Sequence, residues 1–275
     1  MSDKVTAQGR RKSVVGPARV DYHPAATWES DFQVLKSMWF ANVKGENQQE
    51  RLESFYVSQA DLYDSYRHRM LHGRWPMINA MPAPKNGVWV DLGGGTGSNL
   101  EYFGDNLRHW KKVVVLDFCP SLVEVAKNRV KTRGWDSFVD VVLGDACDFD
   151  CPGLPAAGTV DVVTFSYALS MIPDWKMAIK NAFRMLKPGG HIAVCDFTVL
   201  DSNLPAMNSF WTWVFAHDHV HLRKDHILVL KAAFEPQFLE SGYGEFPYVP
   251  GCLRAPWYAY VGKKVSDKIG YETFM

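Results

Sequence analysis

The sequence predicts an α/β fold in which a mostly parallel, doubly wound sheet carries helices on both faces. Residues 88–92 form an apolar run that breaks into a glycine turn over 93–97, and a helical pattern begins at Ser98. A second apolar run follows over 112–117. Between about residues 86 and 199 such runs alternate with helical segments, which is typical of parallel strands joined by crossover helices.

Two segments precede the first expected strand. Residues 1–27 are polar and basic, and we interpret them as a mobile arm, with a lipid or partner contact of the basic cluster 10–12 as the alternative. Residues 28–84 are expected to form a helical lid, because apolar side chains recur every three or four positions. Examples of this spacing are Phe32, Leu35 and Trp39.

Local residues set the helix boundaries in the cofactor-binding core, which we place at about 85–200. A helix is expected over 122–133, because Pro120 and Ser121 precede it and Gly134 follows it. A second helix is expected over 175–186, where Pro188 and two glycines end the pattern.

After residue 199 the sequence becomes aromatic. We interpret residues 201–240 as a substrate cap inserted before the last strands, since function concentrates on loops beyond the carboxyl ends of strands. A helix is expected over 227–234, and the segments 244–249 and 257–261 have strand-like patterns.

The glycine turn indicates a nucleotide-type cofactor. Glycine permits positive φ and lets a ligand approach where a Cβ atom would collide. Asp117 ends the second apolar run, and an acid at this place commonly holds ribose hydroxyls. The turn differs from the Gly-x-Gly-x-x-Gly of dinucleotide enzymes, because its last key glycines, Gly95 and Gly97, are one residue apart.

Four segments in order resemble the motifs of class I S-adenosylmethionine-dependent methyltransferases. They are residues 91–97, 144–147, 160–167 and 187–194. The resemblance implies a seven-stranded Rossmann-like sheet, closed by an antiparallel hairpin, and S-adenosylmethionine as the cofactor.

The resemblance also implies roles for individual residues. Asp117 would hold the ribose or else cap the next helix, and Asp145 would accept from the adenine amino group. Asp91 would order the turn or the cofactor's amino group, with a structural strand-end carboxylate as the alternative. An arginine suits the methionine carboxylate because its donors form a planar fork. The expected cofactor contacts are Tyr63, Arg67, Asp91, Gly93, Gly95, Asp117, Phe118, Asp145, Ala146 and Ser166.

Methyl transfer from a sulfonium is a displacement in which the cofactor supplies the reactive group. The protein must align nucleophile, methyl and sulfur and exclude water, so no nucleophilic triad is expected. Tyr66, Tyr167 and His221 are the candidates for positioning or deprotonating an acceptor amine.

The alternating histidines His217, His219 and His221 could hold a metal on extended backbone. Their flanks look helical, which would scatter the rings. We therefore predict no metal site, and polar substrate contacts or a structural role remain for these side chains.

The flanks carry a narrower resemblance. Segments 55–67, 220–226 and 247–262 resemble the methyltransferase half of betaine-lipid synthase, and the similarity covers most of residues 30–264. It implies threefold N-methylation of diacylglyceryl-homoserine, an amphiphilic lipid, by a peripheral membrane enzyme. Residues 263–275 would be a linker toward a domain that transfers the 3-amino-3-carboxypropyl group, or an ordinary frayed terminus.

Composition limits the remaining classes. The chain has 275 residues, 47% of them hydrophobic, which suffices for a packed core. Thirty basic and 30 acidic residues cancel, which argues against a general nucleic-acid binder. No apolar run approaches the ~20 residues that span a bilayer, and the first residues lack a signal-peptide core. Five cysteines without a close CxxC pair indicate reduced thiols.

These observations favour an intracellular protein at the cytosolic face of a membrane, the endoplasmic reticulum in a eukaryote. Two alternatives stay open. A methyltransferase for small molecules or quinone rings would keep the same core motifs and differ in the cap. A non-catalytic cofactor-binding module would keep the fold without methyl transfer.

Overall fold

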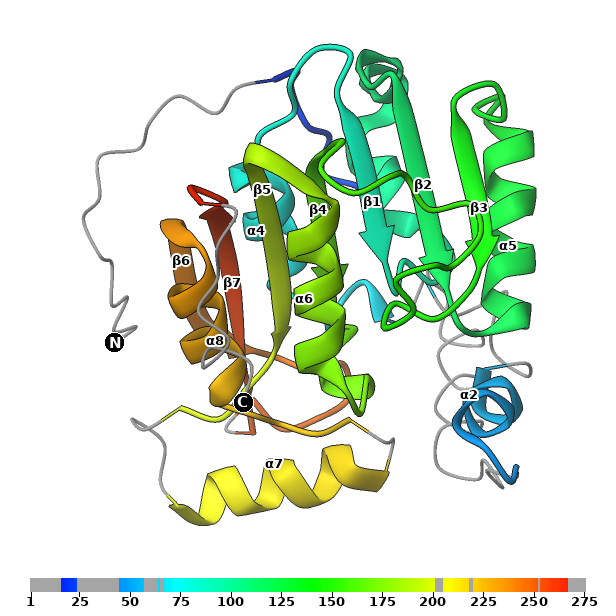
Figure 1. The fold of residues 1–275 in the computed structure, drawn as a ribbon. Coiled ribbons are helices and arrows are strands. Elements are labelled where there is room, and N and C mark those ends of the chain that lie inside the picture. Colours follow the sequence, from blue (N-terminus) through cyan, green and yellow to red (C-terminus); the bar gives the residue numbers. More distant parts are fainter. Residues whose placement is uncertain are drawn as a thin grey trace.

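A seven-stranded sheet organises the chain (Figure 1). The computed structural model describes residues 16–23, 45–56, 64, 67–200, 205–217, 220–251 and 253–266. The strands are β1 (Val88–Leu92), β2 (Lys112–Asp117), β3 (Val139–Leu143), β4 (Val160–Ser166), β5 (Leu186–Phe197), β6 (Glu235–Gly244) and β7 (Ala255–Lys263).

The strand order is β3-β2-β1-β4-β5-β7-β6. Strands β1 to β5 are parallel, and β7 pairs antiparallel with both β5 and β6. This arrangement confirms the predicted doubly wound sheet with a closing antiparallel hairpin. Because β1 to β4 run in one direction, the loops that follow them all emerge at the same edge.

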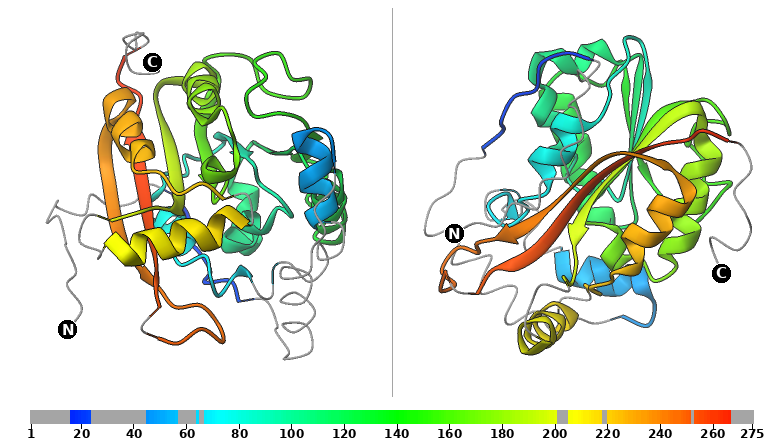
Figure 2. Two further views of the ribbon diagram at one scale, coloured as in Figure 1. Left: turned by 90° about the horizontal axis from the view of Figure 1, so that it is seen from below. Right: turned by 90° about the vertical axis from the view of Figure 1, so that its left-hand side faces the viewer.

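Helices cover both faces of the sheet (Figures 1 and 2). One core includes side chains of α4 and the 3₁₀ helix η1 packed on Trp89 of β1, and the other includes side chains of α6 and α8 packed on Phe165 of β4. The helices are α2 (Gln48–Tyr56), α4 (Arg74–Ala80), η1 (Ser98–His109), α5 (Pro120–Thr132), η2 (Leu169–Met171), α6 (Trp175–Met185), α7 (Pro205–His217) and α8 (Asp225–Ala233).

The boundaries expected for α5 and α6 agree with the structure within a few residues. The helix expected at Ser98 is instead the 3₁₀ helix η1, which is kinked at Gly104 (φ 49°, ψ −132°). Of the helical lid expected over 28–84, the described residues contain α2 and α4. The arm expected over 1–27 is described only at residues 16–23.

The strand expected over 244–249 was misplaced. The sixth strand, β6, ends at Gly244, and residues 245–250 form a loop. This loop contains Pro247 and Pro250, which lack the backbone N–H that a strand ladder requires, while Phe246 packs into the aromatic core. The segment after the alternating histidines, residues 222–226, was also expected to be helical, but α8 begins only at Asp225.

Candidate cofactor and acceptor site

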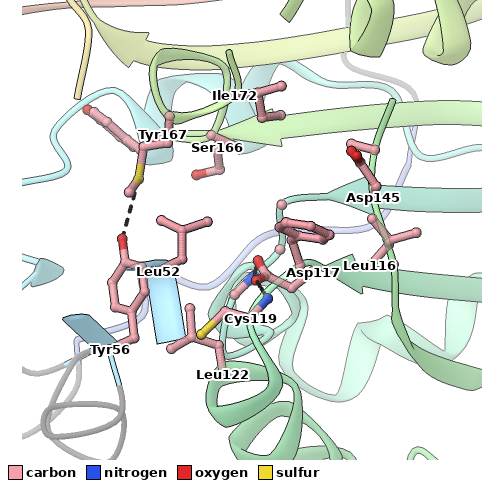
Figure 3. A pocket seen from close by; sticks show the side chains of 18 of the residues that line it. Leu52, Tyr56, Leu116, Asp117, Cys119, Leu122, Asp145, Ser166, Tyr167 and Ile172 are labelled. Carbon is pink, nitrogen blue, oxygen red and sulfur yellow. Dashed lines mark hydrogen bonds between the residues drawn. The ribbon is translucent and has the colours of Figure 1, made fainter. Parts of the chain in front are cut away.

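A cavity of about 350 Å³ lies where the loops after β1, β2, β3 and β4 meet (Figure 3). This volume is within the range of small-molecule sites. The wall consists of residues 93–96, 116–119, 144–147 and 166–168 from the four strand ends, with further side chains from α2, α4 and the segment 171–174.

The glycine turn forms the floor of the cavity. Gly93 and Gly95 have φ of 67° and 57°, a region that side chains with Cβ rarely adopt. A Cβ on Gly93 would lie 2.5 Å from the Cβ of Ala168, so this position must stay bare. A Cβ on Gly95 would meet only Leu122, at 3.9 Å. The bare backbone at Gly95 therefore leaves its space to a ligand.

Asp117 lies beside this turn. Its carboxylate accepts hydrogen bonds from the backbone N–H groups of Gly95 (2.8 Å) and Cys119 (2.9 Å). Burial raises the pKa of Asp117. A carboxylate has about four lone-pair sites, so these backbone bonds leave it able to accept a ribose hydroxyl from a ligand in the cavity.

Asp145, Ala146 and Phe118 line another part of the cavity. The Asp145 carboxylate accepts from the N–H of Cys147 (2.8 Å), and the buried Asn181 holds the Ala146 carbonyl (2.9 Å). The loop after β3 is thereby fixed beside an aromatic ring, an arrangement that can hold an adenine by stacking and by its edge.

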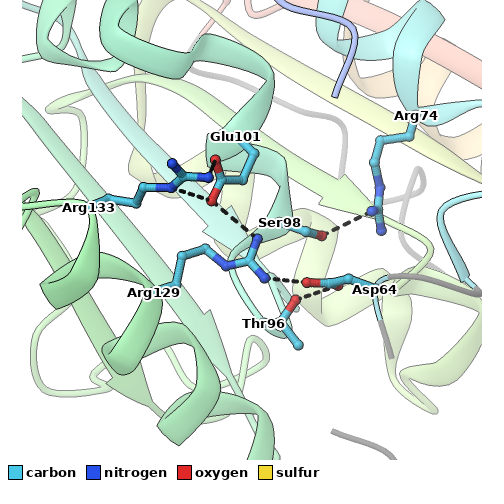
Figure 4. Close-up of polar contacts among 7 residues, drawn as sticks. All are labelled: Asp64, Arg74, Thr96, Ser98, Glu101, Arg129 and Arg133. Atoms are coloured by element: carbon cyan, nitrogen blue, oxygen red, sulfur yellow. Dashed lines mark hydrogen bonds and ion pairs between the residues drawn. The ribbon is translucent and has the colours of Figure 1, made fainter. Parts of the chain in front are cut away.

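Arg74 is a site residue that the sequence did not predict. It lies at the start of α4, is almost fully buried and lines the cavity. Its Nε donates to the Ser166 hydroxyl (3.1 Å). Its Nη1 donates to the Ser98 hydroxyl (3.0 Å), as Figure 4 shows. These hydroxyls fix a planar guanidinium beside the glycine turn, where it can hold a ligand carboxylate.

Arg67, the arginine expected in this role, is buried but does not line the cavity. Asp91 does not line it either. Its fully buried carboxylate accepts from the Asn99 amide (2.9 Å) and from Thr164, and burial raises its pKa to about 6. Asp91 was expected among the cofactor contacts, but its bonds brace the end of β1 beneath the turn, which is the structural role named as the alternative.

Tyr167 forms the wall at the end of β4. It has a positive φ of 55°, its hydroxyl accepts from the N–H of Gly73 (2.8 Å), and its ring packs on Phe197 at 4.6 Å. Burial raises the pKa of this phenol well above 10. The phenol therefore stays protonated at neutral pH, which suits positioning of an acceptor better than deprotonation.

Two further catalytic candidates were expected, Tyr66 and His221. His221 has an exposed side chain outside the cavity wall, and its backbone N–H donates to the Ser170 carbonyl (2.8 Å). Tyr63, Tyr66 and His219 lie outside the described residues. Among the residues that the structure does describe, no group of three His, Cys, Asp or Glu side chains is placed to hold a metal.

Helix α2 connects two sides of the cavity. The Gln49 amide donates to the Phe118 carbonyl after β2 (3.1 Å), and the Gln48 amide donates to the Met171 carbonyl after β4 (3.1 Å). The Tyr56 hydroxyl donates to the Met171 sulfur at 3.3 Å (Figure 3). Gln48, Gln49 and Tyr56 were not among the expected site residues. Tyr56 lies in the segment 55–67, which was noted for its resemblance to the betaine-lipid enzyme.

Comparison with known sequences gives a coherent picture. A family model described as a methyltransferase domain matches residues 62–230. A ubiquinone/menaquinone biosynthesis C-methyltransferase, UbiE, of Hydrogenovibrio crunogenus is 28% identical over 172 residues, 61% of this chain and 66% of that protein. UbiE of Francisella tularensis subsp. novicida is 28% identical over 164 residues, 58% of this chain and 64% of that protein. The chain thus spans just under two thirds of the length of these curated relatives.

Solved structures agree on the fold. Phosphoethanolamine N-methyltransferase 2 of Haemonchus contortus, in complex with phosphomonomethylethanolamine and S-adenosylhomocysteine, superposes with a TM-score of 0.62 at 16% identity. The match covers 81% of this chain and 61% of that one. The YcgJ protein of Bacillus subtilis matches with a TM-score of 0.57 at 16% identity, over 71% of this chain and 99% of that one.

Proposed function

This chain belongs to the methyltransferase-domain family, and from that premise we propose that it transfers methyl groups from S-adenosylmethionine to the amine of a diacylglyceryl-homoserine lipid. Family membership confirms the enzyme class that the four motifs predict. The cofactor is supported by a protein of the same fold, phosphoethanolamine N-methyltransferase 2 of Haemonchus contortus, which has been solved in complex with S-adenosyl-L-methionine. The lipid acceptor and the number of methyl groups are the proposal.

One observation carries the cofactor assignment: the bare turn at Gly95, the acid Asp117 and the buried Arg74 line a single cavity. The three groups match the backbone approach, the ribose and the amino-acid carboxylate of S-adenosylmethionine. Bound in this way, the cofactor supplies an electrophilic methyl group on its sulfonium.

Gly95, Asp117 and Arg74 would hold the cofactor while the acceptor nitrogen bonded to its methyl carbon, and breaking of the carbon–sulfur bond would release S-adenosylhomocysteine. The amine must be neutral to attack, so one proton would pass to a nearby base or to water before each of the three methylations. Tyr167 holds its position through the Gly73 hydrogen bond and presents a ring at the cavity. Together with Tyr56 it can stabilise the quaternary product by a cation–π attraction of about 0.5 to 2 kcal/mol.

Two supports for a lipid amine come from the chain itself. The flanking segments 55–67 and 247–262 resemble the betaine-lipid enzyme, and the cavity wall near Tyr167 is apolar on the side of Leu52 and Met171. The 28% identity to quinone-ring C-methyltransferases favours a second candidate, methylation of a quinone-type phenol.

The acceptor assay offers the purified chain three substrates with labelled S-adenosylmethionine: diacylglyceryl-homoserine in detergent, soluble amines, and quinone-type phenols. We expect the lipid to receive up to three methyl groups, detected by mass spectrometry. EDTA is expected to leave the rate unchanged, because a sulfonium leaving group needs no Lewis acid. Methylation of a phenol or a soluble amine, with the lipid untouched, would refute the betaine-lipid proposal and leave the methyltransferase assignment intact.

A further inference from the structure

Helix α7 leaves aromatic side chains in solvent. It has no Lys, Arg, Asp or Glu over its 13 residues. Trp211 and Phe215 are buried, whereas Trp213 is 73% and Phe210 is 37% exposed. Bulky aromatic side chains on an uncharged helix are normally buried, so the exposed rings of α7 indicate a surface that meets another apolar phase.

This face lies beside the cavity. Figures 1 and 2 show α7 beyond the carboxyl ends of the strands, on the same side of the sheet as α2. Packed aromatic rings join the buried side of α7 to the cavity wall: Tyr167 packs on Phe197 (4.6 Å), and Phe197 packs on Phe215 (4.5 Å).

The loop between β6 and β7 extends the aromatic surface. Phe246 of this loop packs on Trp211 of α7 at 5.3 Å, and two residues later Tyr248 is 67% exposed. Trp and Tyr are the side chains that favour the interface between water and lipid, because each has an apolar ring and a polar edge.

The segment between α7 and α8 contains two cations and one acid, because Asp218 precedes Arg223 and Lys224, and α8 itself begins with a second acid, Asp225. Arg223 and Lys224 are exposed. Basic side chains next to an apolar surface complement anionic lipid headgroups.

We propose that Phe210, Trp213 and Tyr248, flanked by Arg223 and Lys224, form a docking surface for an anionic phospholipid bilayer. The helix is too short to span a bilayer, and over the described ranges no helix is long and apolar enough to do so. Helix α7 would therefore lie in the interface plane with its aromatic side chains among the headgroups. This proposal rests on the proposed function in one respect: it presents the cavity to a lipid acceptor.

The test measures binding of the full chain to vesicles of phosphatidylcholine, with and without phosphatidylserine, in the absence of cofactor and acceptor. Cosedimentation should be strongest with phosphatidylserine. The double variant Phe210→Ser/Trp213→Ser should bind about tenfold more weakly or worse, since two interfacial aromatic side chains are lost. Arg223→Gln/Lys224→Gln should lose most of the preference for phosphatidylserine. The matched control is Val265→Ser, which removes a comparably exposed apolar side chain after β7 at the opposite edge, and should bind like wild type.

A second readout does not depend on the variants folding well. Brominated lipids in the vesicles should quench the tryptophan fluorescence of the wild-type chain, and Trp213→Phe should reduce this quenching. Equal binding of the aromatic variant and wild type would overturn the proposal. So would a concentration-dependent dimer in sedimentation velocity that the aromatic variant abolishes, because the face would then pair with a second copy. Vesicle binding without lipid methylation would retain the docking surface and refute the proposed acceptor.

Discussion

Asp117 joins the second strand to the glycine turn, and its substitution should reduce the affinity for the cofactor. Asp117→Ala should weaken binding of S-adenosylmethionine by about 1 to 3 kcal/mol, because a charge-assisted acceptor is removed. Calorimetric titration measures this loss. Asp140→Ala is the matched control, since that exposed acid pairs with Lys112 (2.7 Å) away from the cavity. Unchanged affinity in the Asp117 variant, with an unchanged melting temperature, would remove Asp117 from the site.

Arg74 provides a test that separates cofactor groups. Arg74→Gln should weaken binding of S-adenosylhomocysteine by about 1.5 to 3 kcal/mol, because the carboxylate loses a charged donor. It should leave binding of 5′-methylthioadenosine, which lacks that carboxylate, nearly unchanged. Arg67→Gln is the comparison, and calorimetry with both ligands is the measurement. Equal losses for the two ligands would show that Arg74 only shapes the cavity.

At this scale the sequence predicts groups that belong to a short motif. Gly93, Gly95 and Asp117 are near one another because a strand, a turn and the next strand bring them together locally. Which of the two arginines, Arg67 or Arg74, lines the cavity depends on the path of the chain between them, and no sequence motif covers that segment. The helical pattern is interrupted by a turn at residues 68–70, so the two arginines do not share one continuous helical face.

At the scale of elements, an ionic network ties the lid segment to α5. Arg129 of α5 pairs with Asp64 and lies 3.6 Å from Glu101, and Thr96 of the glycine turn donates to Asp64 at 2.8 Å (Figure 4). Arg133 also pairs with Glu101 (3.0 Å), but its side chain is 52% exposed, against 13% for Arg129. The Arg129–Asp64 pair is therefore shielded from solvent, whereas the Arg133–Glu101 pair has an exposed cation.

Removing the inner cation should cost far more than removing the outer one. Arg129→Met is expected to lower the free energy of unfolding by about 3 kcal/mol, because it removes the cation that pairs with Asp64 and leaves Glu101 with Arg133 alone. Arg133→Met should cost about 1 kcal/mol or less, since solvent screens its pair. Urea unfolding of both variants measures the difference, and similar losses would contradict the assigned burial.

Elements with local boundary residues are predictable, and elements defined by distant partners are not. Helix α5 begins at Pro120 and ends just before Gly134, so its limits are written in the sequence. Strand β6 is recognisable only from its pairing with β7, and its own sequence has exposed Glu235, Pro236 and Gln237 at its start. The strand expected at 244–249 was therefore placed after β6, which ends at Gly244.

At the scale of the whole molecule, the topology of the sheet determines where the site lies. Parallel strands deliver four loops to one edge, which is why motifs far apart in the sequence line one cavity. The orientation of α7 was not predictable, because it depends on Phe197 and Phe246 packing against Trp211 and Phe215 from distant parts of the chain.

The sheet also buries two acids whose titration should make stability depend on pH. Asp91 and Asp196 are fully buried, and burial raises the pKa of each to about 6 from a usual value of 3.8. The folded state then binds more protons than the unfolded state between about pH 4 and pH 6. Stability from these groups is therefore present at low pH and falls as pH rises through this window, by up to about 2 to 3 kcal/mol for each acid.

The amide substitutions Asp91→Asn and Asp196→Asn isolate this contribution, because an amide cannot ionise. Each should cost stability at about pH 4, where the carboxyl is neutral and hydrogen-bonded in the wild type. The cost should shrink by about 2 to 3 kcal/mol at about pH 7, where wild type carries the buried charge. Urea unfolding at the two pH values measures both costs, with the exposed Asp140→Asn as the control. A cost that stays constant or grows with pH would mean that neither carboxyl ionises across this range in the folded protein.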